Sequence, residues 1–265
     1  MIVESFIIGL RKTGTTWLYE NYKIEKKLNV SSIVKESGYF LNHSLSKEKY
    51  HSLFKKNKDK ENINLEIETG IFDSVDNIKK LLNYNQKARV AIILRNPLSY
   101  FSSRITHCKR KGELRNNKQN SVKKIFEENT WLIEEYSTDR LEFLKNNFKN
   151  FKIFYYEDLE NDSVKFYSNI TQFLTGDFQS KFLPSIRTKI NISRNSKIPF
   201  ITYCYTNFAK YMRSIGLHLV VNYFRNNPIR KFIEKENKII NKSFEYEQIE
   251  NYLKSINFKI PKNYI

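Results

Sequence analysis

Short apolar segments alternate with longer amphipathic segments through the first two thirds of the chain. The apolar segments predict five strands: Ser5–Ile8, Ser32–Val34, Asn64–Ile67, Val90–Leu94 and Lys152–Tyr155. The segments between them predict six helices: Thr15–Lys27, Lys47–Lys56, Val75–Leu82, Leu98–Lys111, Val122–Asn146 and Ser163–Leu174. Strands that alternate with helices are typical of a parallel sheet with crossover helices. We therefore expect an α/β fold of three layers, with a central parallel β-sheet flanked by helices.

The alternation stops after Pro184. A polar loop, Thr188–Pro199, leads to an aromatic and basic helical pattern, Ile201–Arg225, and a further helix is expected before the C-terminus. A length of 265 residues fits one α/β domain. We expect residues 1–180 to form the α/β core and residues 181–265 a basic helical C-terminal cap within the same domain.

The net charge of +18 first suggests an anionic partner such as nucleic acid or a membrane surface. More than half of it lies in residues 181–235, which contain eleven Lys or Arg residues and one acid, Glu234. We expect this segment to face something anionic, although a solvated basic surface is the alternative. The longest later apolar run, Ile215–Phe224, is too short to span a bilayer.

The two cysteines, Cys108 and Cys204, lie far apart in the sequence. They offer neither a disulfide framework nor the spacing of metal ligands, which fits a reducing compartment. The first predicted strand begins at Ser5, which leaves no room in this sequence for a preceding signal peptide or membrane anchor. We therefore expect a cytoplasmic protein without an integral membrane segment.

The first strand runs directly into a glycine-containing loop, Gly9-Leu-Arg-Lys-Thr-Gly-Thr15. In a nucleoside-triphosphate loop the lysine follows the second glycine. Here Thr15 takes that place and Lys12 lies inside the loop. The backbone N–H groups around Gly14, at the start of the next helix, still predict an anion site. The displaced lysine indicates that it contacts a different oxygen of the ligand.

A second anion site is predicted where the buried strand Val90–Leu94 ends. Arg95 follows this strand, and Ser103 lies two helical turns further on. Ligands of open α/β sheets bind at the carboxyl ends of the strands, and an arginine with a hydroxyl suits a phosphate. Two separate cationic sites indicate a nucleotide with phosphates at two ends, and no metal-binding acid follows either strand.

At these motifs the chain resembles the PAPS-dependent sulfotransferase family, whose domain is P-loop-like, and in particular its soluble bacterial type. The resemblance implies PAPS as sulfuryl donor, PAP as product and no metal. It implies that Lys12 meets the bridging oxygen. The implied nucleotide-binding residues are Arg11, Lys12, Thr13, Gly14, Thr15, Thr16, Trp17, Arg95, Ser103, Tyr156, Ser193 and Arg194.

The stretch Ile33-Val-Lys-Glu-Ser-Gly-Tyr-Phe40 is similar to a Lys-Glu-x-x-Phe-Phe motif of carbohydrate-type members, which implies that Glu36 is the general base. The resemblance also implies an acceptor site that includes Phe40, Glu66, Glu68 and His107. The stretch Glu66–Phe72 departs from the family because it lacks the lysine or histidine usual there.

The departure leaves the identity of the general base open. Glu68, His43 and His107 remain alternatives to Glu36. Acids near the acceptor would favour a cationic or hydroxyl-rich molecule.

The predicted function is transfer of a sulfuryl group from PAPS to a hydroxyl or amine of a small-molecule natural product or a carbohydrate, with no nucleic acid partner. One alternative is a P-loop kinase, which would need a lysine after Gly14 and a metal-binding acid after a core strand. Another is a non-enzymatic binding module for nucleic acid or membrane that uses residues 181–235. The sequence does not indicate the oligomeric state.

Overall fold

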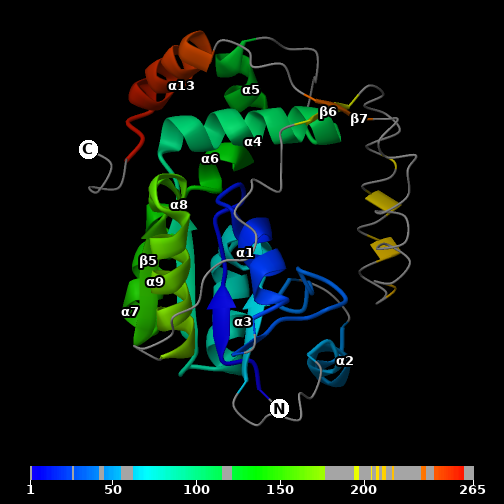
Figure 1. Ribbon diagram of the computed structural model, residues 1–265. Coiled ribbons are helices and arrows are strands. Elements are labelled where there is room, and N and C mark those ends of the chain that lie inside the picture. Colours follow the sequence, from blue (N-terminus) through cyan, green and yellow to red (C-terminus); the bar gives the residue numbers. More distant parts are fainter. Residues whose placement is uncertain are drawn as a thin grey trace.

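The computed structural model has a central sheet of five parallel strands (Figure 1). It describes residues 2–25, 27–41, 45–54, 62–114, 121–176, 194–196, 204, 207–208, 211–212, 217, 234–236 and 242–259. The strands are β1 (Ser5–Ile7), β2 (Leu28–Asn29), β3 (Ile63–Ile67), β4 (Arg89–Leu94) and β5 (Asn150–Tyr155). Their order is β2-β3-β1-β4-β5. The predicted α/β class with a parallel sheet is confirmed.

Helices surround this sheet and lie across one end of it (Figure 1). They are α1 (Thr15–Tyr22), α2 (Lys47–Ser52), the 3-10 helix η1 (Thr69–Asp73), α3 (Val75–Tyr84), α4 (Pro97–Lys111), α5 (Val122–Glu128), α6 (Trp131–Glu134), α7 (Thr138–Asn147), α8 (Tyr156–Asn161), α9 (Ser163–Thr175) and α13 (Lys242–Ser255). Two further strands, β6 (Arg194–Ser196) and β7 (Glu234–Glu236), pair antiparallel.

The alternation of strand side chains divides the core between the two faces of the sheet. Ile7 and Ile93 belong to a buried cluster with side chains of α1 and α9, whereas Phe6 and Ile92 belong to a cluster with side chains of α3, α4 and α7. Successive side chains of a strand point to opposite faces, so both faces need a helical cover. The central strand β4 is accordingly apolar on both sides from Val90 to Leu94.

The order of the strands determines where a ligand site can form. The chain leaves β1 toward β2 and β3 on one side, and β4 and β5 lie on the other. In open α/β sheets such a reversal leaves a crevice at the carboxyl ends of the strands. Here it places the loop after β1 beside the loop after β4. Helix α4 crosses above these strand ends, and α13 packs against α4 and α5 (Figure 1).

The predicted strand Ser32–Val34 is wrong, because the strand of this region is β2, four residues earlier. The hydroxyl of Ser31 accepts hydrogen bonds from the backbone N–H groups of Ile33 and Val34, at 3.2 Å each. A serine hydroxyl that bonds the backbone two and three residues on forms a turn. This turn ends the extended segment before residue 32.

The predicted helix Val122–Asn146 is also wrong, because it is three helices, α5, α6 and α7. Asn129 ends α5, and its buried side-chain amide donates to the carbonyl of Ile125 at 2.9 Å. Ser137 then starts α7, since its hydroxyl accepts from the N–H of Arg140 at 3.3 Å. Side chains that bond the local backbone compete with a continuous helix.

Much of the C-terminal third lies outside the described residues. Within the predicted polar loop 188–199 the structure has the short strand β6. Most of the predicted helix 201–225 lies outside the described residues, and the division into a core and a cap stays a prediction. No helix in the described ranges is long and apolar enough to cross a membrane.

Candidate active site

The loop between β1 and α1 is closed by its own hydrogen bonds and depends on a glycine. The buried hydroxyl of Thr13 donates to the carbonyl of Leu10 at 2.7 Å. Gly14 caps α1 with φ 79°, and a Cβ there would lie 2.5 Å from Cδ2 of Leu159. Only glycine adopts that conformation readily, and only glycine fits against α8. The N–H groups at the start of α1 therefore stay open to an anion.

Lys12 lies in this loop in a strongly cationic environment. Its backbone is left-handed, with φ 65°. Burial and the positive charges of Arg110 and Arg95 are the largest of the effects that lower the pKa of Lys12 to about 8. Among the described residues its ammonium has neither a hydrogen bond nor an ion-pair partner. A half-buried cation with further cations around it is stabilised by an anionic ligand.

Arg95 joins the second predicted anion site to the first. Its guanidinium donates to the carbonyl of Lys12 at 3.0 Å and to the hydroxyl of Ser99 at 2.9 Å, and it lies over the ring of Tyr156 at 4.3 Å. Ser103 is half-buried one turn of α4 beyond Ser99. The structure thus brings together Lys12, Arg95 and Tyr156.

The side chain of the predicted residue Arg11 is held by acidic side chains of η1 and of the end of α6. Its guanidinium pairs with both carboxylate oxygens of Asp73, one of them at 2.7 Å, and lies 3.8 Å from Glu135. Glu135 in turn receives two hydrogen bonds from Arg104, each of 2.7 Å. This chain of charges anchors the loop to η1, α4 and the end of α6. The side chain of Arg11 is therefore engaged by the protein, while its backbone remains part of the loop.

The candidate base Glu36 lies beside the loop. One of its carboxylate oxygens accepts hydrogen bonds from Lys35 and from the hydroxyl of Thr69, at 2.9 Å each. Burial tends to raise the pKa of Glu36, but Lys35, Arg11 and Thr69 outweigh burial and lower it to about 2. Its side chain is 40% exposed. Glu36 is thus ionised and accessible, next to the start of α1.

Glu66 and Glu68 are buried beneath the segment that contains Glu36. Glu66 accepts a hydrogen bond from the N–H of Ser37 at 3.2 Å, and Glu68 accepts one from the N–H of Gly38 at 2.7 Å. Burial and the neighbouring carboxylates raise the pKa of both, that of Glu68 to about 7. Their carboxyl groups hold the backbone that presents Glu36. The expectation of a cationic acceptor, which rested on these acids, gains no support from this placement.

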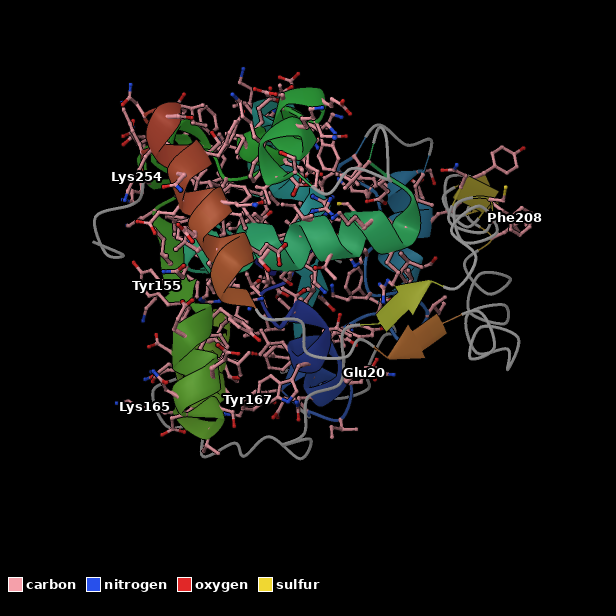
Figure 2. The ribbon with its side chains drawn as sticks, turned by 90° about the horizontal axis from the view of Figure 1, so that it is seen from above. Glu20, Tyr155, Lys165, Tyr167, Phe208 and Lys254 are labelled. Carbon is pink, nitrogen blue, oxygen red and sulfur yellow. The ribbon has the colours of Figure 1, made fainter. Side chains whose placement is uncertain are left out.

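Two further predicted residues are His107 on α4 and Trp17 on α1. Nδ1 of His107 lies 3.1 Å from a guanidinium nitrogen of Arg110. Burial and the charges of Lys111 and Lys12 lower the pKa of His107, so its ring is neutral. Trp17 is buried and packs edge-on against Tyr167, which projects from α9 toward α1 in Figure 2.

Of four further predicted residues, the structure describes two, Phe40 and Arg194. Phe40 is buried against Phe6 with ring centroids 5.6 Å apart. Arg194 begins β6, and Ser193 and His43 lie outside the described residues.

Sequence reasoning did not include three residues that the structure places at the site. Lys35 donates to the hydroxyl of Thr15 at 3.0 Å, Tyr136 donates to the carbonyl of Arg95 at 2.9 Å, and Glu135 anchors Arg11. Lys35 stands next to Glu36 in the sequence, which was a usable signal. Tyr136 and Glu135 come from a helical segment with no motif, so only the folded chain reveals them.

The fold and the loop after β1 define an α/β protein with a phosphate-type loop at the carboxyl ends of its parallel strands. The sequence model of the sulfotransferase domain matches residues 4–243. The chain therefore belongs to the sulfotransferase family. In the described part of the chain, no cluster of His, Cys, Asp and Glu could hold a metal ion.

Several solved sulfotransferases are similar to this chain at low sequence identity. A sulfotransferase from Alicyclobacillus acidocaldarius is 16% identical, covers 87% of this chain and 99% of its own, and superposes with a TM-score of 0.58. A mouse sulfotransferase in complex with PAP is 20% identical over 67% of this chain and 59% of its own, with a TM-score of 0.43.

The sulfotransferase domain of a Synechococcus olefin synthase is 14% identical over 97% of this chain and 95% of its own, with a TM-score of 0.48. No curated protein sequence matches this chain. The likeness to the Alicyclobacillus enzyme supports the fold, and the family match supports sulfuryl transfer.

Proposed function

We propose that this protein transfers the sulfuryl group of PAPS to a hydroxyl or amine of a small-molecule natural product or a carbohydrate and releases PAP. In this reaction the bond between sulfur and the bridging oxygen breaks, a bond from sulfur to the acceptor forms, and the acceptor loses a proton. The observation that supports the proposal best is the environment of Lys12, a half-buried cation among further cations next to the N-terminus of α1.

The residues at the strand ends fit a donor with phosphates at two ends. Lys12, Thr15 and the N–H groups after Gly14 suit the 5′ end, because they combine a lysine, a hydroxyl and the N-terminus of α1. Arg95 and Ser103 suit the 3′-phosphate, since a guanidinium and a hydroxyl on adjacent elements favour phosphate. Tyr156 lies next to both proposed phosphate sites, because its ring contacts Arg95 and is close to Gly14.

When bound, PAPS supplies an activated sulfuryl group whose departure leaves negative charge on a phosphate oxygen. We assign to Lys12 the stabilisation of that charge. A fixed cation in a site from which water is partly excluded stabilises developing negative charge more strongly than water does. The backbone of the loop is held by Thr13 and by the pairing of Arg11 with Asp73, so the donors need no rearrangement as charge develops.

We assign to Glu36 the role of general base. It is ionised, its side chain is accessible, and Glu66 and Glu68 fix the backbone on which it stands. Glu68 is buried and both its oxygens accept backbone hydrogen bonds, so it is less available to an acceptor. His107 is neutral, as a base must be, and remains the alternative on the side of α4.

The test is calorimetric titration of the purified protein with PAP, followed by conversion of PAPS to PAP in the presence of an acceptor mixture. We expect PAP to bind without metal and Lys12→Ala to abolish PAPS conversion with the fold intact by circular dichroism. Glu36→Gln should lower kcat and leave PAP affinity nearly unchanged. Absence of PAP binding, or magnesium-dependent hydrolysis of ATP, would overturn the proposal.

A further inference from the structure

Lys35 connects the two halves of the proposed active site. Its ammonium nitrogen lies 3.0 Å from the hydroxyl oxygen of Thr15 and 2.9 Å from the carboxylate of Glu36. Thr15 is the first residue of α1, where the loop binds an anion, and Glu36 is the proposed base. The side chain of Lys35 is only 13% exposed, so this bridge is held within the protein rather than formed at its surface.

The direction of these hydrogen bonds determines what Thr15 can do. An ammonium has three N–H donors and no acceptor. Lys35 therefore donates to Thr15, and the hydroxyl proton of Thr15 is left to point elsewhere. Two of the three donors of Lys35 are used by Thr15 and Glu36, and the third has no partner among the described residues. Both the proton of Thr15 and the third donor of Lys35 are thus available to one anion.

Lys35 links the proposed anion site to the proposed base. Glu36 shares its carboxylate oxygen between Lys35 and the hydroxyl of Thr69. Charges near a protein surface interact more strongly than in bulk water, because the effective dielectric constant is lower there. An anion bound at Thr15 would therefore compete with Glu36 for Lys35. Occupancy of the anion site would then weaken the hold of Lys35 on the carboxylate.

We propose that Lys35 is a second lysine of the donor site, which contacts the 5′-phosphosulfate end of the nucleotide together with Thr15 and releases Glu36 for proton transfer when the donor is bound. The proposal rests on the proposed function, because it assigns the anion at Thr15 to the 5′ end of PAPS. It also gives the pair of Lys35 and Glu36 a role: Lys35 would hold the carboxylate of Glu36 until the donor competes for the ammonium.

The experiment compares two nucleotides that differ only at the 5′ end. PAP has a 5′-phosphate, and adenosine 3′-phosphate lacks it. Lys35→Met keeps the length of the side chain and removes the charge. We expect it to weaken PAP binding, measured by calorimetry, by about tenfold or more, the loss of one charge-assisted contact. The affinity for adenosine 3′-phosphate should stay within about twofold of the wild type, since a twofold change alters the binding free energy by less than RT.

Two further variants serve as controls. Lys23→Met removes another lysine next to α1, one that pairs with the partly exposed Glu20 at 2.9 Å, and should change neither affinity. Lys35→Arg keeps the charge and should restore at least part of the PAP affinity. Thermal melts of all three variants show whether each is folded. If Lys35→Met does not fold, the PAP affinity of Lys35→Arg is compared with that of the wild type instead.

The outcomes separate the two proposals. If the wild type binds neither nucleotide, the proposed function itself fails. If the wild type binds PAP and Lys35→Met binds it equally well, Lys35 is no donor ligand and this inference is overturned. Equal losses for PAP and adenosine 3′-phosphate would also overturn it, because the effect would then be a general one on the fold rather than a contact at the 5′ end.

Discussion

The guanidinium of Arg95 lies over the ring of Tyr156, with 4.3 Å between the guanidinium carbon and the ring centroid, although the two residues are far apart in the sequence. Arg95 follows β4 and Tyr156 follows β5, and these neighbouring parallel strands end at the same edge of the sheet. The contact with the ring and the hydrogen bond to the carbonyl of Lys12 together hold the guanidinium in place. The sheet itself thus orients the cation that we assign to the 3′-phosphate.

Replacement of Tyr156 tests this orientation. Tyr156→Phe keeps the ring, and we expect PAP affinity within about twofold of the wild type. Tyr156→Ala removes the stacked face and should weaken PAP binding by about tenfold, since a partly desolvated cation–π contact contributes roughly 1–2 kcal/mol. Calorimetric titration measures both. Equal affinity of the two variants would show that the phenyl ring does not support Arg95.

Lys12 makes PAP binding depend on pH. In the free protein its pKa is lowered to about 8, chiefly by burial and by Arg110. A bound anion favours the ammonium form and raises this pKa, so binding is accompanied by proton uptake above pH ~8. We expect full PAP affinity below that pH and a decline of up to about tenfold per pH unit above it. Titrations in buffers of different ionisation enthalpy measure the proton uptake.

The control for this pH dependence is Lys12→Met, which removes the titrating group. The PAP affinity of this variant should be lower than that of the wild type. It should no longer fall between pH 8 and 9, because the ammonium that loses its proton in this range is gone. If the variant retains the same decline with pH, another group titrates and the assignment to Lys12 is contradicted.

The loops at the strand ends were predictable because each depends on a local pattern. Gly14, Lys12 and Arg95 could be placed from glycine spacing and from the ends of apolar runs, and the structure brings Lys12 and Arg95 within one hydrogen bond of each other. The side of the loop that Arg11 faces was not predictable, since its partners Asp73 and Glu135 come from distant segments. A motif specifies the backbone of the loop, whereas tertiary partners decide where its side chains point.

The acids at the end of β3 show the same limit. The resemblance to the family implied that Glu66 in β3 and Glu68, just after it, belong to the acceptor site. In the structure both are buried beneath the Ser37–Gly38 backbone, whose N–H groups they bind. The sequence cannot show this covering segment, because its position depends on the turn at Ser31 rather than on any periodicity.

Glu135 should contribute strongly to stability. Arg104 is 4% exposed and donates two hydrogen bonds to Glu135, so Glu135→Ala leaves a buried cation without its main partner. Breaking a buried pair in this way costs about 3–5 kcal/mol. The matched control is Glu127→Ala, whose pair with Lys123 is exposed and 3.8 Å long, with an expected change within about 0.5 kcal/mol. Urea unfolding measures both, and comparable losses would contradict the prediction.

Gly14 should be indispensable for the anion site for two separable reasons. Its φ of 79° is unfavourable for a side chain, and the added Cβ of Gly14→Ala would lie 2.5 Å from Leu159. Gly112→Ala isolates the first reason, because Gly112 has φ 66° at the end of α4. We expect Gly112→Ala to cost about 1–2 kcal/mol of stability with unchanged PAP binding.

Gly14→Ala should lose PAP binding as well as stability, since the loop must move to admit the methyl group. Adding Leu159→Ala to Gly14→Ala makes room for it and should restore part of the affinity in the same titration. If the double variant binds no better than Gly14→Ala, the close approach to α8 is not what demands glycine, and the backbone angle alone accounts for the loss.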